Sequence, residues 1–297
     1  MIGFGSIGAR HARILSEFGH QVSVVSSRPN AEFECFSSVS DLLESISPDY
    51  VVIASPTSQH FNDLTKLSEH NFGGKILIEK PLFHAPMIIP HLATESVAVG
   101  YNLRFHPLVE RLRQVLTDLD TVTNASLHAG QLLSEWRPGR DYRETSSARQ
   151  STGGGVLRDL SHELDLAFYL FGNMNVTSVQ SSLSGLLDID GPDKIDISCS
   201  TDSGSEVAIT LNYLDKPAQR IISVTINDIE YKADLVNRSL EVDGVVSHID
   251  ITRDESYRRM HQSILCGDMS RCATVEDGLR IVQFIDQIER RLPRDAT

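Results

Sequence analysis

Three glycines near the start of the chain have the spacing of a phosphate-binding loop. The stretch GFGSIG places them at positions 3, 5 and 8, directly before a helix-like run. In such a loop the first glycine permits a tight turn, the second lets a pyrophosphate approach the backbone, and the third lets the helix pack on its strand. The helix N-terminus adds free N–H groups and a partial positive charge. The pattern favours a dinucleotide site over a plain glycine-rich turn, with contacts at Gly3, Gly5, Ser6, Ile7 and Gly8.

The residues after the next strand-like run bear on which dinucleotide would bind. NAD sites usually place an acidic residue there, about 20 residues after the glycines, to bind the ribose 2′-OH. This sequence reads VVSSRPN, with Ser26, Ser27 and Arg28 in place of an acid. Two hydroxyls and a guanidinium suit a 2′-phosphate, so we expect NADP to be preferred and keep NAD as the alternative.

A lysine and a histidine could supply the two groups that hydride transfer from an alcohol requires. A base takes the hydroxyl proton, and a positive group stabilises the developing alkoxide. Lys80 ends the strand-like run KILIEK, where open α/β sheets bind their ligands. His162 belongs to the residue type that titrates near neutral pH. On a continuous helix His162 would share a face with Asp159 and Glu163, and the Asp159 carboxylate would orient the imidazole, with Asp165 as an alternative partner.

Arginines gather in one short stretch of an otherwise acidic chain. Their guanidinium groups bind phosphate or carboxylate in a bidentate manner. With aromatic residues nearby, this composition suits the diphosphate or acid group of a sugar nucleotide, although loop arginines are often only solvated. The arginines are Arg137, Arg140, Arg143, Arg149 and Arg158. The expected substrate-binding residues are Tyr101, Asn102, Arg104, His106, Trp136, Arg137 and Tyr142.

Two different patterns of secondary structure must hold these residues. Up to about residue 100, buried strand-like runs alternate with helical ones, which predicts a parallel, doubly wound sheet of the Rossmann type. Beyond it, period-two strands and several helices predict an α+β domain with an open, mostly antiparallel sheet. We therefore expect a dinucleotide-binding domain over 1–100 and a substrate-binding and oligomerisation domain over 101–297. Predicted strands cover 21–26, 49–56, 75–81, 96–101, 121–130, 194–201, 206–214, 219–227 and 229–236. Predicted helices cover 7–18, 37–47, 58–71, 106–119, 153–172, 255–267 and 274–292.

The first strand of the Rossmann sheet is unusually short. Only Met1, Ile2 and Phe4 represent it, although this strand should occupy the middle of the sheet. A start site placed too late, or a trimmed chain, explains the shortness better than a different fold does. The glycine loop is then expected to lose part of its anchorage, and the affinity for the cofactor to decrease.

Composition excludes several other classes of protein. The 297 residues carry 40 acidic and 27 basic side chains, and this net charge of −13 argues against binding nucleic acid or anionic membranes. No apolar run reaches the roughly 18 residues that cross a bilayer, and no basic-then-apolar leader is seen. The four cysteines lack CxxC or zinc-like spacing, so we expect reduced thiols in a cytoplasm and no metal site.

Three further motifs give the sequence a family resemblance. They are SPTSQH at 55–60, EKPL at 79–82 and GGGVLRDLSHELD at 153–165, in this order after the glycine loop. With these motifs the chain resembles, over essentially its whole length, the glucose–fructose oxidoreductase / inositol dehydrogenase (Gfo/Idh/MocA) family. Members pair a Rossmann domain with an α/β domain whose open sheet often forms the oligomer interface. Most oxidise or reduce a hydroxyl or keto carbon of a sugar, cyclitol or related compound with NAD(P).

The resemblance implies roles for individual residues. Lys80 would be the active-site lysine that touches both the nicotinamide and the substrate oxygen, and His162, assisted by Asp159, would shuttle the proton. Many members carry the aspartate four residues before the histidine, whereas here the spacing is three, as in other branches. Spans 100–107 and 135–150 resemble a branch found in sugar-nucleotide and surface-polysaccharide metabolism. Further cofactor contacts are expected at Ser55, Pro56, Thr57, His60 and Glu79.

The sequence thus predicts an NAD(P)-dependent oxidoreductase of a sugar or sugar nucleotide, assembled as a dimer or tetramer. In this interpretation Lys80 and His162, from different domains, act on the same substrate atom. One alternative is a protein that senses NAD(P) on the same scaffold and regulates a partner without turnover. Another is an oxidoreductase of a non-sugar such as a linear tetrapyrrole, which fits the arginine-rich stretch less well.

Overall fold

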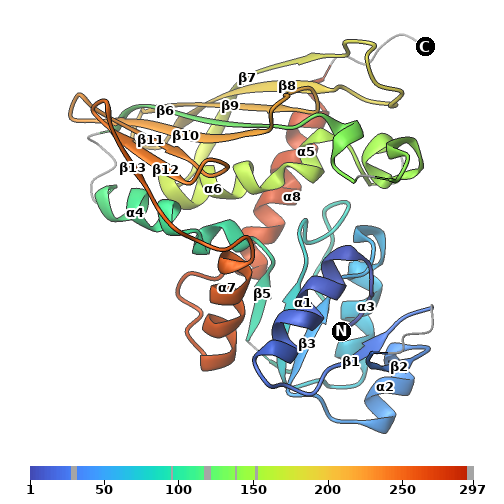
Figure 1. Ribbon diagram of the computed structural model, residues 1–297. Helices are drawn as coiled ribbons and strands as arrows, with labels where there is room; N and C mark the ends of the chain where they lie inside the picture. Colours follow the sequence, from blue (N-terminus) through green and yellow to red (C-terminus); the bar gives the residue numbers. More distant parts are fainter. Residues whose placement is uncertain (28–31, 95, 117–121, 138, 151–152, 293–297) are drawn as a thin grey trace. The chain divides into compact units, whose positions relative to one another are not determined.

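The computed structural model describes residues 1–27, 32–94, 96–116, 122–137, 139–150 and 153–292 (Figure 1). The chain forms two compact units. Unit 1 consists of residues 1–105 and 254–283, and unit 2 consists of residues 106–253 and the chain from 284 onward. The boundary expected near residue 100 lies close to the end of the first segment of unit 1. The sequence analysis did not anticipate that residues 254–283 return to this unit.

Unit 1 contains a parallel sheet in which a single residue joins two groups of strands. Ile2 forms parallel bridges to Val25 on one side and to Ile53 on the other. The order across the sheet is therefore β2, β1, Ile2, β3, β4 and β5. This is the strand order of a Rossmann domain, which confirms the predicted fold class. The strands are β1 (Ser23–Val25), β2 (Glu34–Phe36), β3 (Tyr50–Ile53), β4 (Lys75–Ile78) and β5 (Val97–Val99).

The short first segment occupies the central position that a Rossmann fold requires. The Ile2 N–H group donates to the carbonyl of Val52 at 2.8 Å, and the Ile2 carbonyl accepts from Ala54 at 2.7 Å. On the other side, the Gly3 N–H group donates to Val25 at 3.0 Å. These bonds tie the start of the glycine loop to both neighbouring strands, although the segment is too short to count as a strand.

Helices pack on this sheet through their apolar positions. In the helix after the glycine loop, Ala12, Ile14 and Leu15 are buried, and Leu64 and Leu67 are buried in the helix after β3. Apolar residues at helical spacing form such a core-facing stripe. The helices of unit 1 are α1 (Ser6–Glu17), α2 (Val39–Ser45), α3 (Thr57–Glu69), the 3-10 turn η1 (Asn102–Phe105) and α7 (Glu255–Cys266).

The returning segment is firmly held within unit 1. Helix α7 packs against α1 and η1. After α7, the N–H group of Val99 in β5 donates to the Ala273 carbonyl at 2.8 Å. The guanidinium of Arg104, which is 5% exposed, forms an ion pair with Asp277 at 3.0 Å. Residues 254–283 therefore complete the core of the nucleotide-binding unit rather than extending the second one.

Unit 2 is built on an eight-stranded sheet of order β13-β12-β11-β10-β6-β9-β8-β7. Neighbouring strands are antiparallel except for β6 and β9, which are parallel, and this confirms the mostly antiparallel sheet. Helices α4, α5 and α6 contact its strands and lie along one face (Figure 1). The strands are β6 (Val122–Gly130), β7 (Met174–Ser182), β8 (Lys194–Thr201), β9 (Glu206–Asn212), β10 (Gln219–Ile226), β11 (Ile229–Asp234), β12 (Ser239–Val242) and β13 (Val245–His248).

The helix predicted over 153–172 is divided into two. Helix α5 (Val156–Asp159) ends at Leu160, whose φ of −101° and ψ of 28° leave helical geometry, and α6 (Ser161–Phe171) follows. Most residues of α6 are buried, polar ones included. The remaining helices are α4 (Pro107–Val115) and α8 (Val275–Glu289), and α8 runs from unit 1 into unit 2. Within the described ranges, no helix has the length and apolar character needed to cross a membrane.

Candidate functional site

The glycine loop has the geometry of a phosphate cradle. Gly3 has a φ of +89°, and a Cβ there would lie 2.5 Å from the backbone nitrogen of Ser55. A Cβ on Gly8 would overlap the Gly3 carbonyl oxygen, whereas a Cβ on Gly5 would meet nothing within 4 Å. Gly5 is the N-cap of α1, and no side chain caps this helix start. Gly3 and Gly8 thus allow the loop to pack closely, and Gly5 leaves open space in front of the N–H groups at the start of α1. This space suits the pyrophosphate of a dinucleotide.

The residues expected to select NADP follow β1 at the same edge of the sheet. The Ser26 N–H group donates to the Phe36 carbonyl at 3.1 Å, and Ser27 is exposed. Arg28 lies outside the described residues. The preference for NADP therefore stays a prediction.

The motif after β3 is tied to the segment that follows Lys80. Pro56 is the N-cap of α3, which begins at Thr57. His60 is 1% exposed, and its Nε2 lies 2.9 Å from the Ser55 carbonyl while its Nδ1 lies 3.1 Å from the Leu82 carbonyl. These contacts hold two loops together at the carboxyl edge of the sheet, which favours a positioning role for His60. Its contact with a cofactor stays a prediction.

Lys80 is the second residue after β4, at the carboxyl edge that also holds the glycine loop. Its side chain is half-buried. The neighbouring Glu79 is buried, and its Oε2 accepts a hydrogen bond from the Lys80 backbone N–H at 3.2 Å. Its other oxygen, Oε1, lies 2.8 Å from Nε2 of His11 in α1. Sequence reasoning missed His11, although a histidine among the apolar positions of the first helix was a visible signal.

The helix break at Leu160 bears on the predicted pairing of Asp159 with His162. Because of this break, the angular argument that placed the two residues on one face does not apply, and the pairing stays a prediction. The Asp159 carboxylate accepts a hydrogen bond from the Tyr213 hydroxyl at 2.7 Å. Burial raises the pKa of Tyr213 well above its usual value, and the Asp159 charge adds to this effect, so the phenol stays a donor.

His162 is also buried rather than directed to solvent, with an exposed fraction of 8%. The adjacent Glu163 is 1% exposed and forms an ion pair with Arg220 of β10 at 2.7 Å. Burying a charge is costly unless it is paired, so this ion pair explains how Glu163 is tolerated there. Lys80 belongs to unit 1 and His162 to unit 2, and their action on one atom stays a prediction.

Several expected substrate-binding residues have local structural partners. Asn102 donates to the Ser256 hydroxyl at 2.6 Å, and Arg104 pairs with Asp277. Tyr101 is 1% exposed. His106 caps α4, because its Nδ1 accepts from the Leu108 N–H group at 3.2 Å. These contacts favour structural roles, and Arg104 in particular is engaged inside unit 1.

The arginine stretch provides fewer anion-binding groups than its composition suggested. Three of its members have carboxylate partners, Asp141 for Arg143, Asp188 for Arg149 and Glu289 for Arg158. In the part of unit 2 that the structure describes, Arg137 and Arg140 form no ion pair, and both are exposed.

The aromatic residues of this stretch have partners of their own. Trp136 stacks edge-on against Tyr213, with ring centroids 5.3 Å apart. The Tyr142 hydroxyl accepts from the Asp188 N–H group at 3.0 Å. The candidates for holding an acidic group are thereby reduced to Arg137 and Arg140, next to Trp136.

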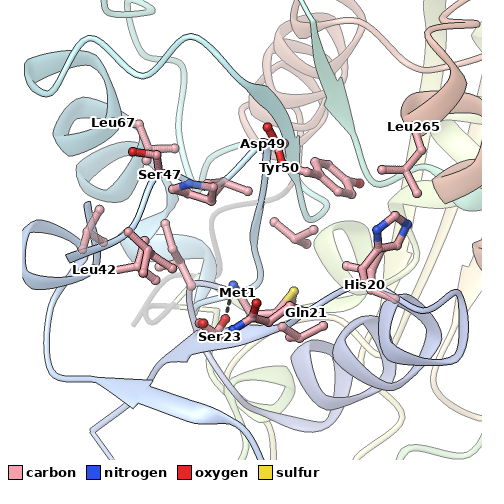
Figure 2. Close-up of a pocket in the computed structure, with 18 residues that line it drawn as sticks. Met1, His20, Gln21, Ser23, Leu42, Ser47, Asp49, Tyr50, Leu67 and Leu265 are labelled. Atoms are coloured by element: carbon pink, nitrogen blue, oxygen red, sulfur yellow. Dashed lines mark hydrogen bonds between the residues drawn. The ribbon is translucent and has the colours of Figure 1, made fainter. Parts of the chain in front are cut away.

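A cavity of about 380 Å³ opens in unit 1 away from these motifs (Figure 2). Its walls include Met1, Ser23, Leu42 and Tyr50. Ser23 and Tyr50 begin β1 and β3, so the cavity lies at the amino edge of the parallel sheet. Ligands of such sheets bind at the carboxyl edge, so this cavity is not the dinucleotide site.

Comparison with known proteins agrees with the fold and the loop. Residues 1–95 match an oxidoreductase family with an NAD-binding Rossmann fold, Gfo/Idh/MocA. Curated protein sequences gave no significant match. Levoglucosan dehydrogenase in complex with NADH and levoglucosan superposes with a TM-score of 0.81 at 15% identity, covering 98% of this chain and 95% of that one.

Two sugar-nucleotide enzymes are similar in structure as well. The WlbA dehydrogenase from Bordetella pertussis, in complex with NADH and UDP-GlcNAcA, has a TM-score of 0.79 at 17% identity, over 100% of this chain and 96% of that one. UDP-N-acetylglucosamine 3-dehydrogenase GnnA from Acidithiobacillus ferrooxidans has a TM-score of 0.75 at 19% identity, over 98% and 96%. These likenesses show a shared fold over the whole chain. The first 95 residues thus match the NAD-binding Rossmann domain of the Gfo/Idh/MocA oxidoreductase family, and the whole chain has the same fold as the solved sugar dehydrogenases.

Proposed function

We propose that the protein is an NAD(P)-dependent oxidoreductase that acts on a hydroxyl or keto carbon of a sugar or sugar nucleotide. The observation that carries the proposal is the glycine loop, whose open space at Gly5 precedes the uncapped start of α1 in a domain that matches an NAD-binding oxidoreductase family. Enzymes of the same fold that act on levoglucosan and on UDP-sugars support the substrate class.

Each proposed catalytic residue has a distinct task. The bound nicotinamide would accept or supply the hydride. The Lys80 ammonium, at the carboxyl end of β4, stabilises negative charge that develops on the reacting oxygen. The His162 imidazole takes the hydroxyl proton during oxidation and returns it during reduction. The Asp159 carboxylate accepts a hydrogen bond from the Tyr213 hydroxyl, so Asp159 has a positioning role in unit 2.

The substrate's acidic group is assigned to the two exposed arginines that have no carboxylate partner in the described part of unit 2. In the sequence, Arg137 directly follows Trp136, and Arg140 lies three residues further on. A pair of guanidinium groups next to an indole can hold a diphosphate or a carboxylate while the indole packs on an apolar surface. This favours a sugar nucleotide or a sugar acid over a neutral sugar.

Finer features belong to the same proposal. Ser26 and Ser27, with Arg28, favour NADP over NAD because no acid follows β1 to bind a free 2′-OH. A homo-oligomer formed through the open sheet of unit 2 and a cytoplasmic location complete it.

The test is a turnover assay that follows reduced nicotinamide by absorbance. UDP-N-acetylglucosamine, a UDP-sugar acid and levoglucosan would each be offered with NAD and with NADP. We expect the UDP-sugars to be oxidised faster, and Lys80→Ala and His162→Ala each to lower kcat by at least about 100-fold. The exposed Asn237→Ala serves as the control with parental activity.

Two results would refute the proposal in different ways. If Lys80→Ala and His162→Ala turn over the substrate as fast as the parent, the assigned chemistry is wrong. If the parent binds the dinucleotide tightly but turns over none of the sugars in either direction, a dinucleotide-sensing role replaces the enzyme.

A further inference from the structure

A continuous chain of buried hydrogen bonds leads from Tyr50 to Glu79 inside unit 1. The Tyr50 hydroxyl lies 3.0 Å from Nδ1 of His261, and Nε2 of His261 lies 2.7 Å from Nδ1 of His11. Nε2 of His11 then lies 2.8 Å from Oε1 of Glu79. Both imidazoles are 0% exposed. The four residues come from β3, α7, α1 and the end of β4, so four separate elements converge on this chain.

The protonation states of Tyr50 and His261 are compatible with donation of hydrogen bonds from Tyr50 towards Glu79. Burial raises the pKa of Tyr50 well above its usual value, so its hydroxyl keeps the proton and can donate it. Burial lowers the pKa of His261 well below 6.5, and nearby His11 and His20 lower it further, so this imidazole is neutral. A neutral imidazole has one donor and one acceptor nitrogen. If Nδ1 of His261 accepts from Tyr50, then Nε2–H donates to His11, and Nε2–H of His11 donates to Glu79.

The chain ends next to the proposed catalytic lysine. One Glu79 oxygen accepts from His11, and the other accepts from the backbone N–H of Lys80 at 3.2 Å. Gly100 packs against the Glu79 carboxylate, and a Cβ on Gly100 would lie 2.8 Å from Oε1 of Glu79. The packing therefore leaves the Glu79 carboxylate room for this arrangement only because residue 100 has no side chain. Other titratable side chains around the chain are His20, Tyr257 and Cys272.

Two other interpretations of this cluster fit less well. Histidines beside a carboxylate can bind a metal, but among the described residues no group of three or more potential ligands has the geometry to do so. A purely structural cluster would not need an aligned donor and acceptor at every step, since apolar side chains of the same volume fill a core at lower cost.

We propose that His261 and Tyr50 are positioning residues that, through His11, hold the Glu79 carboxylate fixed against the Lys80 backbone. This inference rests on the proposed function in one respect, because Lys80 is the residue whose placement matters for turnover. It assigns a task to helix α7, whose return to unit 1 brings His261 to α1. It also names residues that no motif of the sequence had singled out.

The experiment compares variants at the two ends of the chain. His261→Met removes both polar contacts at similar volume, and His261→Gln restores an acceptor and a donor. Tyr50→Phe removes only the terminal hydroxyl, and it keeps the test valid if His261→Met folds poorly. Met260→Leu, a buried neighbour on α7 outside the chain, is the packing control.

The first readout needs neither cofactor nor substrate. Nitrogen chemical shifts of ¹⁵N-histidine report which ring nitrogen carries the proton. We expect His261 of the parent to be a neutral Nε2–H tautomer at pH 7, and His11 to carry a proton on the Nε2 atom that faces Glu79. In His261→Met we expect His11 to become a mixture of tautomers and the Lys80 backbone amide resonance to shift, whereas Met260→Leu changes neither. An Nδ1–H tautomer of His261 in the parent, or an unchanged His11 in His261→Met, would overturn the inference.

The second readout is turnover. We expect His261→Met to lower kcat by about 10- to 100-fold with little change in the KM for the dinucleotide, and His261→Gln to recover most of this loss. Parental kcat in a folded His261→Met variant would refute the positioning role. If the parent itself turns over no sugar, the proposed function fails, and the tautomers and the Lys80 amide still decide whether the hydrogen-bond chain holds Glu79 as described.

Discussion

Gly5→Ala should weaken cofactor binding, whereas Gly8→Ala should lower the stability of the fold, because Gly5 faces open space and Gly8 faces the backbone. A Cβ at Gly5 would meet nothing within 4 Å, whereas one at Gly8 would overlap the Gly3 carbonyl oxygen and lie 3.1 Å from its carbon. The backbone of Gly5, with φ −81° and ψ −167°, suits any residue. Gly5→Ala should therefore fold normally while its methyl group fills the space that a pyrophosphate would enter.

The expected magnitudes differ between the two variants. Hydrogen bonds to a charged group contribute about 1.5–3 kcal/mol, so the loss of one phosphate contact in Gly5→Ala corresponds to about 10- to 150-fold weaker dinucleotide binding. Its free energy of unfolding should change by about 1 kcal/mol or less, the usual effect of alanine at an N-cap glycine. Gly8→Ala gains about 1 kcal/mol of helix propensity but pays about 1–3 kcal/mol for overpacking against backbone, so the folded state should lose up to about 2 kcal/mol.

Calorimetric titration with NADH and NADPH would measure binding, and thermal unfolding followed by circular dichroism would measure stability. Gly73→Ala is the matched control, because a Cβ there also meets nothing within 4 Å and the residue lies before β4, far along the chain from the loop. We expect it to leave both measurements unchanged. If Gly5→Ala binds both dinucleotides as tightly as the parent, the loop is not the phosphate site.

Three further predictions concern stability and accessibility. Burial raises the pKa of both Cys199 and Cys272 to about 11. A thiol reagent at pH 8 should therefore label only the exposed Cys35 and Cys266 in the native protein, and all four cysteines after denaturation. Rapid labelling of four thiols without denaturant would contradict this prediction. Asp277→Ala should lower the free energy of unfolding by about 3 kcal/mol in a denaturant titration, because it removes the carboxylate partner of the buried Arg104. Arg143→Ala, in an exposed pair, should have no measurable effect, and equal effects of the two variants would refute the argument. The folded state keeps the pKa of His261 well below 6.5, so the unfolded chain takes up a proton first on acidification. From pH 7.5 to 5.5 the free energy of unfolding of the parent should therefore decrease by about 1.4 kcal/mol more than that of His261→Gln. Parallel curves of stability against pH for the two proteins would exclude a buried neutral His261.

The sequence predicted the elements whose patterns are local. Apart from β2 (Glu34–Phe36), which was not predicted, the strands of the nucleotide-binding half and its helices α1, α2 and α3 were expected within a few residues, because buried β-branched runs and amphipathic helices alternate there. The strand β8 has the bounds that its period-two pattern predicted. By contrast, β13 is exposed along its whole length and offers no alternation to detect. The helix break at Leu160 was missed for a similar reason, since SHELD carries neither glycine nor proline to mark it.

The candidate site was predictable only where a motif lies in one stretch. The glycine loop and the EKPL segment could be located from the sequence, since their geometry depends on neighbours in the chain. The partners of Glu79 could not, because His261 is separated from His11 by 250 positions. Likewise, nothing in the spacing of Arg104 indicated that Asp277 would neutralise it. Contacts that depend on which distant element returns to a sheet are set by the tertiary fold.

The return of residues 254–283 to unit 1 has a consequence for how the protein is made. During synthesis the segment carrying His11 and Arg104 leaves the ribosome long before residues 254–283, which supply their partners His261 and Asp277. Until residues 254–283 have been synthesised, His11 lacks its contact with His261 and Arg104 lacks its ion pair with Asp277, so the core of the nucleotide-binding half is incomplete. A fragment ending at residue 105 should accordingly be insoluble or sensitive to protease, and a separately supplied peptide spanning 254–283 should rescue it.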